Sequence, residues 1–427
     1  MTLEIKERIE QIRRGEVPEG YKKTKVGIIP IEWKVTKFKK LFSRVTRKNK
    51  ENNDNVLTIS AQYGLISQRE FFNKDIASED KSNYYLLEKG EFAYNKSYSN
   101  GYPFGALKRL DMYDKGVVSP LYICFAATKD NKCPDFYVHY FEAGKMNREI
   151  QAFAQEGARN HGLLNIAVDD FFNSYIVAPS FAEQRKISEI LSMQDKIIAL
   201  KEKLIEEKKR QKKHIVYEIL SQNIKLQKQD GIKYPQWNTN NIGTYLTSRN
   251  IKQIPTEDAP LMAFVADVGV VSKGERYDRS FLVKSDEKEY KLTELNDFIY
   301  SSNNLDVGSI GLNNYGRAVI SVVYEIFSVN SNVIPIVISE IIQMKSNINK
   351  ILKYRQGALY GQYRIFAEDF LSVKIDVPSF EEQHEIARVI LSLEKEIELL
   401  QKELEQEKQK KKALMQLLLN GIVRVKL

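Results

Sequence analysis

Cysteine is almost absent from this chain of 427 residues, which contains only Cys124 and Cys133. Two cysteines at this spacing provide neither a disulfide framework nor a paired zinc motif, so we expect a reducing compartment. The longest apolar run, around residues 333–338, is too short to cross a bilayer and includes Pro335. The N-terminus lacks the apolar segment of a signal peptide. These absences predict a cytoplasmic protein that does not engage a membrane.

Motifs for metal binding and catalysis are also missing. The four histidines have no second ligand at helical or turn spacing, which predicts no metal site. No Pro-Pro dipeptide occurs, which excludes the Asp/Asn-Pro-Pro-aromatic loop of amino-methyltransferases. Gly269 and Gly274 have the outer spacing of a phosphate loop, but Glu275 stands where the phosphates need a lysine. The sequence therefore predicts no catalytic residues and favours a protein that binds.

The composition favours a polyanionic partner. Lys and Arg number 65 against 56 Asp and Glu, which gives a net charge of +9 and a pI near 9.0. A solvated surface with an excess of lysine would give the same numbers. The 20 Phe and 23 Tyr residues, in a chain that is 43% hydrophobic, are sufficient for two ordinary cores.

The chain contains a long internal repeat. The segment Pro-Ser-Phe-Ala-Glu-Gln at 179–184 returns as Pro-Ser-Phe-Glu-Glu-Gln at 378–383, a shift of 199 residues. The match continues without a gap for about forty residues. A unit of this length is far larger than a solenoid or propeller repeat, which spans roughly 20–50 residues. The sequence is therefore a tandem duplication of a domain followed by a helix.

Residues 181–223 and 380–420 are predicted to be long helices. Aliphatic residues recur at heptad spacing among charged residues, and neither glycine nor proline interrupts the two stretches. Ser180 with Glu183, and Ser379 with Glu382, have the spacing of a capping box. The narrow apolar stripe on each helix favours pairing with the other copy over packing on its own domain. The predicted seam residues are Ile190, Leu191, Ile197, Ile198, Leu204, Ile205, Ile390, Leu393, Ile397, Leu400 and Leu404.

The segments before each helix are predicted to be β-rich and mixed. Short alternating or apolar runs are separated by Gly- and Asn-rich turns, and 145–155 and 345–355 are predicted to be short helices. The predicted fold class is α+β, with two β-rich mixed domains, two long helices and a pseudo-twofold tandem repeat. The predicted segments are an N-terminal helical segment at 1–20, the first globular domain at 21–179, the central helix at 180–224, the second globular domain at 225–378, and the C-terminal helix and tail at 379–427.

Loops of the two predicted domains carry residue types that suit DNA. Amides and hydroxyls read base edges, Lys and Arg hold phosphates, and tyrosines stack or pack on sugars. Asn and Ser are also ordinary turn residues. These loops differ between the two copies although the helices match, as expected if the copies read different sequences. The candidate DNA-binding residues are Gln62, Tyr63, Asn95, Lys96, Ser97, Tyr98, Tyr102, Arg159, Asp267, Ser301, Ser302, Asn303, Asn304 and Arg317.

Taken together, the pattern resembles the specificity subunit of Type I restriction-modification systems over essentially the whole chain. The resemblance is carried by the Pro-Ser-Phe-x-Glu-Gln start of each long helix, the basic heptad-bearing helix after it, and the order domain, helix, domain, helix. A Pro-x-x-Trp opening precedes the first domain at Pro30 to Trp33. In the second domain, Pro235-Gln236-Trp237 is one residue shorter.

The resemblance implies a function in which each globular unit is a target-recognition domain that reads one half of a split, asymmetric double-stranded DNA site. The two helices would lie antiparallel as a coiled coil, set the spacer and dock two modification subunits. The partners would carry S-adenosylmethionine and methylate adenine, and further restriction/translocase subunits would use ATP and Mg²⁺; the chain itself would bind no cofactor and catalyse nothing. The residues implied at the subunit interface are Phe181, Glu183, Gln184, Phe380, Glu382 and Gln383.

Two alternatives remain open at the level of sequence. The first is the recognition subunit of a related restriction system whose methylase and nuclease are fused in one partner. The second is a coiled-coil scaffold whose globular units bind proteins, although the basic balance and the Asn, Lys and Tyr loops count against it. A tyrosine recombinase would need an Arg/His/Tyr constellation, which we do not find.

Overall fold

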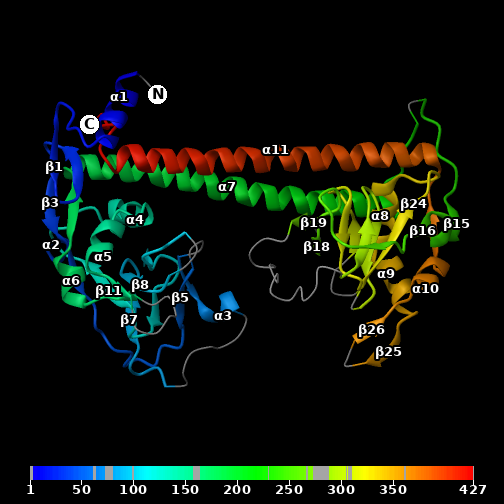
Figure 1. Ribbon diagram of the computed structural model, residues 1–427, viewed down its shortest axis with the longest axis horizontal. Coiled ribbons are helices and arrows are strands. Elements are labelled where there is room, and N and C mark those ends of the chain that lie inside the picture. The colour runs from blue at the N-terminus through cyan, green and yellow to red at the C-terminus, as the bar shows by residue number, and fades with distance from the viewer. Residues whose placement is uncertain are drawn as a thin grey trace. The chain divides into compact units, whose positions relative to one another are not determined.

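Figure 1 shows the computed structural model of the chain. The chain divides into two compact units, called unit 1 (1–202 with 402–427) and unit 2 (203–401). Both long helices therefore contribute to both units. The described residues are 3–60, 64–72, 80–98, 101–156, 164–228, 230–265, 268–272, 288–303, 305, 310–359 and 362–426.

Unit 1 begins with a short helix and a β-rich domain, and the first long helix, α7, starts within it. The elements are α1 (Leu3–Arg13), β1 (Tyr21–Thr24), β2 (Gly27–Pro30), β3 (Lys34–Lys37), α2 (Phe38–Leu41), β4 (Phe42–Arg44), β5 (Leu57–Ser60), β6 (Gly64–Ser67), α3 (Gln68–Phe72), β7 (Tyr85–Glu88), β8 (Phe92–Asn95), β9 (Ala106–Arg109), β10 (Lys115–Val118), β11 (Ile123–Ala127), α4 (Pro134–Glu142), α5 (Asn147–Phe153), β12 (Gln155–Glu156), β13 (Leu164–Asn165), α6 (Val168–Asn173), β14 (Tyr175–Ala178) and α7 (Phe181–Leu220).

Unit 2 contains the second domain and the start of the second long helix, α11. The elements are β15 (Asn238–Asn241), the 3₁₀ turn η1 (Ile242–Thr244), β16 (Leu246–Ser248), β17 (Lys252–Gln253), β18 (Met262–Val265), β19 (Gly269–Ser272), β20 (Tyr290–Thr293), β21 (Phe298–Ser301), β22 (Ile310–Leu312), β23 (Ala318–Ile320), β24 (Tyr324–Val329), α8 (Pro335–Gln343), α9 (Lys345–Leu352), β25 (Gln356–Leu359), β26 (Gln362–Arg364), α10 (Ala367–Ser372), β27 (Lys374–Val377) and α11 (Phe380–Leu418).

The two units repeat the same sheet topology. A four-stranded antiparallel sheet in the order β4-β11-β8-β9 in unit 1 corresponds to β16-β24-β21-β22 in unit 2. The strand that leads into each long helix pairs with the first strand of its domain, β14 with β3 and β27 with β15. The prediction of a mixed α+β repeat with two long helices is confirmed, and so are the short helices, now α5 and α9.

The cores of the two units differ in composition. In unit 1, Phe38, Phe42, Phe92 and Phe125 are fully buried, and their rings meet at centroid distances of 4.7–5.6 Å. In unit 2, Phe298 and Phe327 keep the aromatic positions of Phe92 and Phe125. Other positions become aliphatic, and α8 supplies branched aliphatic residues where α4 supplies aromatic ones. Aromatic pairs add edge-to-face and stacking attraction to the burial of their area. The same topology is therefore filled in two different ways.

Within each unit the two long helices run antiparallel. In unit 1, Gln194 donates to Glu407 (2.6 Å) and Lys201 pairs with Glu403 (2.6 Å), so rising numbers on α7 meet falling numbers on α11. In unit 2, Lys208 and Lys212 pair with Glu396 (2.6 Å) and Glu394 (2.7 Å) in the same sense. Ion pairs flanking an apolar seam are typical of coiled coils.

Most of the predicted seam residues are covered, but Leu191 belongs to the core cluster of unit 1 and Ile390 to that of unit 2, so the helix–helix seam stays a prediction for these residues. Ten of the eleven are buried or half-buried, including Leu191, Ile205 and Ile390 at 4% exposure or less. Leu204 differs, because its side chain is 39% exposed. Polar Gln194 and charged Lys201 contact the other helix between the aliphatic residues. Apolar spacing alone therefore included one residue that the helix pair does not cover.

Candidate nucleic-acid interface

The predicted DNA-binding residues lie at strand ends and in the loops after them. Nine of the fourteen belong to the part of the chain that the structure describes. The other five lie outside the described residues: Gln62, Tyr63, Arg159, Asp267 and Asn304.

In unit 1, Asn95 to Tyr98 extend the central strand β8 beyond the sheet. Asn95 accepts a hydrogen bond from the backbone N–H of Ser97 (3.1 Å), and the carbonyl of Lys96 accepts one from Leu164 (3.0 Å). The backbone is thus held in place, while the ring of Tyr98 is 62% exposed. Lys96 and Tyr98 present a cation and an aromatic ring, which suit phosphate contact and stacking.

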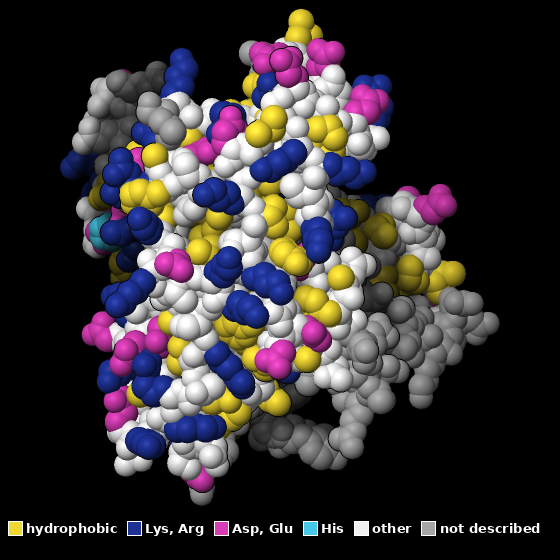
Figure 2. All heavy atoms as spheres, turned by 90° about the vertical axis from the view of Figure 1, so that its left-hand side faces the viewer, with side chains coloured by type: hydrophobic (Ala, Val, Ile, Leu, Met, Phe, Trp, Pro, Cys, Tyr) yellow, Lys and Arg dark blue, Asp and Glu magenta, His cyan; other side chains and the backbone are white. Residues whose placement is uncertain are grey.

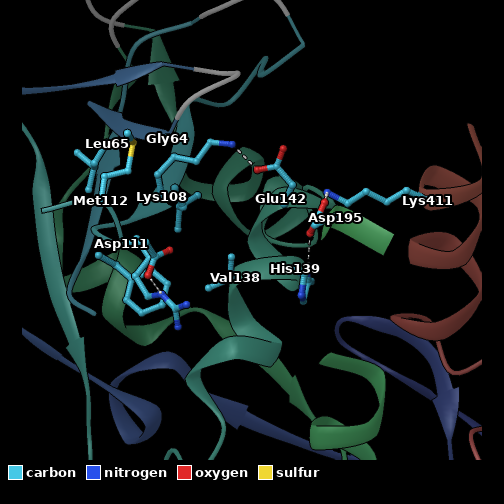
Figure 3. Close-up of a pocket in the computed structure, with 13 residues that line it drawn as sticks. Gly64, Leu65, Lys108, Asp111, Met112, Val138, His139, Glu142, Asp195 and Lys411 are labelled. Atoms are coloured by element: carbon cyan, nitrogen blue, oxygen red, sulfur yellow. Dashed lines mark hydrogen bonds and ion pairs between the residues drawn. The ribbon is translucent and has the colours of Figure 1, made fainter. Parts of the chain in front are cut away.

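Tyr102 occupies a different environment. Its hydroxyl donates to Glu142 on α4 (2.6 Å), and Lys108 on β9 contacts both groups. Figure 3 shows the ion pair between Lys108 and Glu142. Burial raises the pKa of Tyr102 above its ordinary value, and the Glu142 carboxylate adds to the rise. The Tyr102 hydroxyl is therefore tied to an internal carboxylate, and the expectation that this tyrosine contacts DNA stays a prediction.

Two predicted residues of unit 2 are also committed to internal bonds. Ser302 is 3% exposed and donates to the carbonyl of Val323 (2.9 Å). Arg317 forms ion pairs with Asp258 (3.1 Å) and Glu294 (2.8 Å), so its charge is already balanced. These bonds stabilise the turns beside β21 and β23. Ser302 is buried by them, whereas the Arg317 side chain remains 46% exposed, and its contact with DNA stays a prediction.

The remaining described candidates of unit 2 continue β21. Ser301 donates to the carbonyl of Asn303 (2.7 Å), and Asn303 forms an isolated bridge with Arg364, the last residue of β26. This position corresponds to Asn95 to Tyr98 after β8 in unit 1. The two units therefore present different side chains at the same place in the fold.

The Pro-Ser-Phe-x-Glu-Gln motif caps each long helix from inside its unit. The hydroxyls of Ser180 and Ser379 accept the backbone N–H groups of Glu183 and Glu382, each at 3.3 Å. Half of the predicted capping box is therefore present. The carboxylates do not complete it by returning to the serine N–H. Instead, they accept from the indole N–H of Trp33 (2.8 Å) and Trp237 (3.0 Å).

The glutamines of the motif also have internal partners. The amides of Gln184 and Gln383 donate to the carbonyls of Pro179 and Pro378, both at 2.9 Å, and Gln383 also accepts the N–H of Ile334 (2.8 Å). Both are at most 8% exposed, as are Glu183 and Glu382.

This burial corrects the prediction that all six motif residues lie at a subunit interface. Phe181 and Phe380 are the two that remain accessible, at 48% and 47% exposure.

The two buried glutamates differ in their charge partners. Arg424, in the tail after α11, contacts both carboxylate oxygens of Glu183, at 2.7 and 3.1 Å. Gly421 permits this return of the chain, because it adopts φ +66° and a Cβ there would lie 2.5 Å from Pro30. In unit 2, burial raises the pKa of Glu382, although the indole of Trp237 acts to lower it.

A three-residue joint links each domain to the two long helices. In unit 1, His139 on α4 lies 3.7 Å from Asp195 on α7, and Asp195 pairs with Lys411 on α11 at 2.5 Å (Figure 3). In unit 2, Glu340 on α8 lies 3.5 Å from Lys212 on α7, which pairs with Glu394 on α11 at 2.7 Å. These joints have no local signal in the sequence, because their members lie on three separate elements.

The joints have different electrostatics. Burial lowers the pKa of His139 below its ordinary value, although Asp195 acts to raise it. His139 Nε2 also lies 3.1 Å from the hydroxyl of Ser192. Burial acts to lower the pKa of Lys212, but its glutamate partners outweigh burial and raise it. The joint of unit 1 therefore includes a histidine whose protonated form is disfavoured by burial, whereas the joint of unit 2 holds a lysine whose charged form is favoured.

The hollow beside the unit 1 joint measures about 260 Å³ and is lined by Lys108, Arg109, His139 and Glu142 among others (Figure 3). Its charged groups are largely paired: Arg109 binds Asp111 (2.7 Å) and Asp135 (2.6 Å). No group of three or more His, Cys, Asp or Glu side chains suited to a metal ion occurs in the part of the chain that the structure describes. None of the helices in that part has the length and apolar character of a membrane span.

Comparison with known proteins points to one class. No family model matches the sequence. A protein of Methanocaldococcus jannaschii assigned as the specificity subunit of the type I restriction enzyme MjaX is 23% identical over 432 aligned residues, covering 96% of this chain and 97% of that protein.

One solved structure shares the fold of the chain. A chain of a type I R-M system, solved in work on its assembly and conformational transition, covers 92% of this chain and 99% of its own length, with 12% identity and a TM-score of 0.54. The HsdS subunit from Thermoanaerobacter tengcongensis covers 92% and 98%, with 12% identity and a TM-score of 0.44. In sequence over nearly its whole length, the chain is similar to a type I restriction specificity subunit, and it shares the fold of a type I R-M component.

Proposed function

We propose that the chain is the DNA-specificity subunit of a type I restriction-modification complex. The observation that carries the proposal is the duplicated fold in which matching helix starts support domains with different side chains at the same strand end. Each domain reads one half of a bipartite, asymmetric site on double-stranded DNA. Lys96 and Tyr98 in unit 1, and Ser301 and Asn303 in unit 2, lie at the positions that face the DNA.

The proposed partners carry the chemistry. The chain itself is non-catalytic and binds no cofactor, and it acts in the cytoplasm. Two modification subunits supply S-adenosylmethionine-dependent adenine methylation, and restriction/translocase subunits supply ATP- and Mg²⁺-dependent translocation and cleavage. This division of labour is supported by the lack of catalytic motifs in the sequence and by the name of the Methanocaldococcus relative.

Phe181 and Phe380 are the proposed docking residues for the modification subunits. They are exposed apolar side chains at equivalent positions, and each is fixed at the start of a long helix by a buried Glu-Gln pair. Aromatic side chains are enriched at the centres of protein interfaces. Replacing both with serine reduces assembly in this proposal and leaves folding intact, since neither ring belongs to a core.

The long helices set the spacer between the half-sites in this proposal. Four residues inserted near Glu206 and Glu207 lengthen α7 by about 6 Å, which is close to two base-pair steps. The inserted variant recognises the same half-sites with a spacer longer by one or two base pairs. An active variant with the original spacer contradicts this role for the helices.

One experiment tests the proposed function directly. The chain is co-expressed with its neighbouring methyltransferase, and methylated adenines are mapped genome-wide by single-molecule sequencing. The expected result is one bipartite motif with a fixed non-specific spacer. Exchange of residues 33–178 for the corresponding domain of another specificity subunit changes one half of the motif only. A motif without two halves, or one altered on both sides by the exchange, contradicts the proposal.

A further inference from the structure

The positive charge of the chain is concentrated in one segment of unit 1. Residues 22–50 contain 11 of the 65 Lys and Arg residues but only one acid, Glu32. The net charge of this segment alone is therefore larger than the net charge of +9 of the whole chain. Glu32 does not offset the excess, because it already pairs with Arg424 from the C-terminal tail (2.8 Å).

The structure places much of this charge on one edge of the domain, called the basic edge. Five of its six side chains are exposed and Lys37 is half-buried. Within the described residues none of the six has an acid at ion-pair distance. The basic edge consists of Lys23 on β1, Lys34 and Lys37 on β3, Lys39 and Lys40 on α2, and Arg44 on β4.

Neighbouring elements add further positive charge and little compensation. Lys25 lies over the ring of Tyr175, at 4.8 Å from its centroid, and Tyr175 is the cross-strand neighbour of Lys37. Asp169 and Asp170 on α6, which packs against α2, are exposed acids, yet no ion pair joins either to the basic edge among the described residues. Figure 2 views the side of unit 1 on which β1, β3 and α2 are labelled in Figure 1. It shows many Lys and Arg side chains there and fewer acids.

At the equivalent edge of unit 2, the four lysines of β3 and α2 have uncharged counterparts. β15 pairs with β27 as β3 pairs with β14. The residue after each first strand donates its backbone N–H to the carbonyl just before the last strand: Phe38 to Ser174 and Ile242 to Val373, both at 2.9 Å. At the positions of the four lysines of β3 and α2, unit 2 has Asn238, Asn241, Gly243 and Thr244. The fold therefore does not require lysine at this edge.

Unpaired like charges at this density destabilise a domain through mutual repulsion, and a polyanion removes the cost. The duplex presents one negative charge per roughly 1.7 Å of axis, and long flexible lysines contact phosphates without reading sequence. An acidic protein face would favour fixed ion pairs with defined geometry, whereas the basic edge spans four elements without a shared pocket.

We propose that the basic edge binds the DNA backbone beside the half-site that unit 1 reads, and that unit 2 has no such contact. The inference rests on the proposed function. It makes DNA binding asymmetric, because both units read bases but only unit 1 also binds the phosphates of the flanking duplex. This phosphate contact contributes salt-dependent affinity and no sequence preference.

The test exchanges the edge of unit 1 for that of unit 2. The variant Lys34→Asn, Lys37→Asn, Lys40→Thr is assembled with the modification subunits and titrated with a labelled duplex carrying the motif mapped for the parent. Each lost phosphate contact reduces the slope of log K against log salt by about 0.9. Loss of all three contacts reduces the steepness of this slope by about 2.7. The ratio of the parent's affinity to the variant's affinity therefore falls about 40-fold between 50 and 200 mM salt. The methylated motif stays the same, and hydroxyl-radical protection shortens beside the half-site of unit 1.

A matched control removes three exposed lysines elsewhere, Lys6→Gln, Lys353→Gln and Lys426→Gln, and keeps the parent slope. The reciprocal variant Asn238→Lys, Asn241→Lys, Thr244→Lys gains slope and protection beside the other half-site. Thermal unfolding of each complex checks that the substitutions leave the fold intact.

The outcomes separate this inference from the proposed function. A parent complex without a bipartite motif refutes the proposed function. If the parent has its motif but the edge variant keeps the parent slope and footprint, the basic edge does not bind DNA. A variant that loses modification subunits at an unchanged slope shows that the edge binds an acidic protein face, which also overturns the inference.

Discussion

The starts of the two long helices have nearly the same sequence but different electrostatics. Glu183 is buried against Trp33 and the guanidinium of Arg424, whereas Glu382 is buried against Trp237 without an arginine at that distance in the described residues. The difference arises from the path of the chain beyond each helix. After α11 the chain ends in a short tail that returns to unit 1, while after α7 it continues toward the second domain. A repeated motif therefore stabilises its two copies to different extents.

The largest expected difference between the two starts concerns the tryptophans. Trp33 is fully buried, whereas Trp237 is only half-buried. Trp33→Ala should destabilise unit 1 by about 3–5 kcal/mol, and Trp237→Ala should cost unit 2 less than about 3 kcal/mol. Native-state hydrogen exchange of β8 and β21 measures the two units separately. Equal losses would show that the two indoles contribute alike despite their different burial.

The second-largest difference is expected for the buried carboxylates of the two helix starts, Glu183 and Glu382. Glu183→Gln keeps an acceptor for the indole but loses the charge opposite Arg424. It should cost about 1–2 kcal/mol, at the lower end for charged hydrogen bonds because the Arg424 side chain is 38% exposed. Glu382→Gln should leave unit 2 at least as stable at pH 7, because it removes a buried charge. The measurement is urea unfolding followed by tryptophan fluorescence. A Trp237→Phe background leaves Trp33 to report on unit 1, and a Trp33→Phe background leaves Trp237 to report on unit 2.

The two units should also respond to pH with opposite slopes. The depressed pKa of His139 means that unit 1 loses stability as the pH falls below the ordinary value of 6.5. The raised pKa of Glu382 means that its contribution to unit 2 is fully present below 4.5 and is lost as the pH rises through the folded-state value. His139→Asn and Glu382→Gln should remove the respective slopes. Slopes of the same sign in both units would contradict this assignment.

The smallest expected effect separates the two joints. Lys411→Gln and Lys212→Gln each break partly exposed ion pairs and should cost about 0.5 kcal/mol. They differ in one spectroscopic consequence, because Lys411 helps to lower the pKa of His139. NMR titration of His139 should show a higher pKa in Lys411→Gln and no change in Lys212→Gln. An unchanged pKa in both variants would exclude electrostatic coupling across the joint.

The parts of this fold that could be predicted from sequence are those governed by periodicity. The heptads of α7 and α11, the proline before each helix and the 199-residue shift all act locally along the chain, so their signal is readable without a structure. Leu204 shows the limit: it has seam spacing, yet its exposure depends on which α11 residues lie opposite.

Contacts between distant residues were less predictable. The partners of Glu183 are 150 and 241 positions away, at Trp33 and Arg424, so the motif was interpreted as a docking surface when most of it is an internal cap. Arg317 and Tyr102 were chosen as residue types that suit DNA, and their acidic partners Asp258, Glu294 and Glu142 could not be identified without the fold. The loop residues outside the described ranges keep the status of predictions.

Unit 1 is discontinuous in sequence, and this determines the order in which the chain can fold on the ribosome. Met415, Leu418 and Leu419 complete its core, and Arg8 and Tyr21 bond to the carbonyls of Ile422 and Gly421. At about 5–20 residues per second, synthesis reaches residue 402 roughly ten seconds or more after residue 202. Unit 2, a continuous segment, can therefore be complete before the domain that was made first. During that interval, the apolar residues of unit 1 that α11 later covers are exposed and can bind chaperones. Shortening the C-terminus should therefore destabilise the first domain rather than the second.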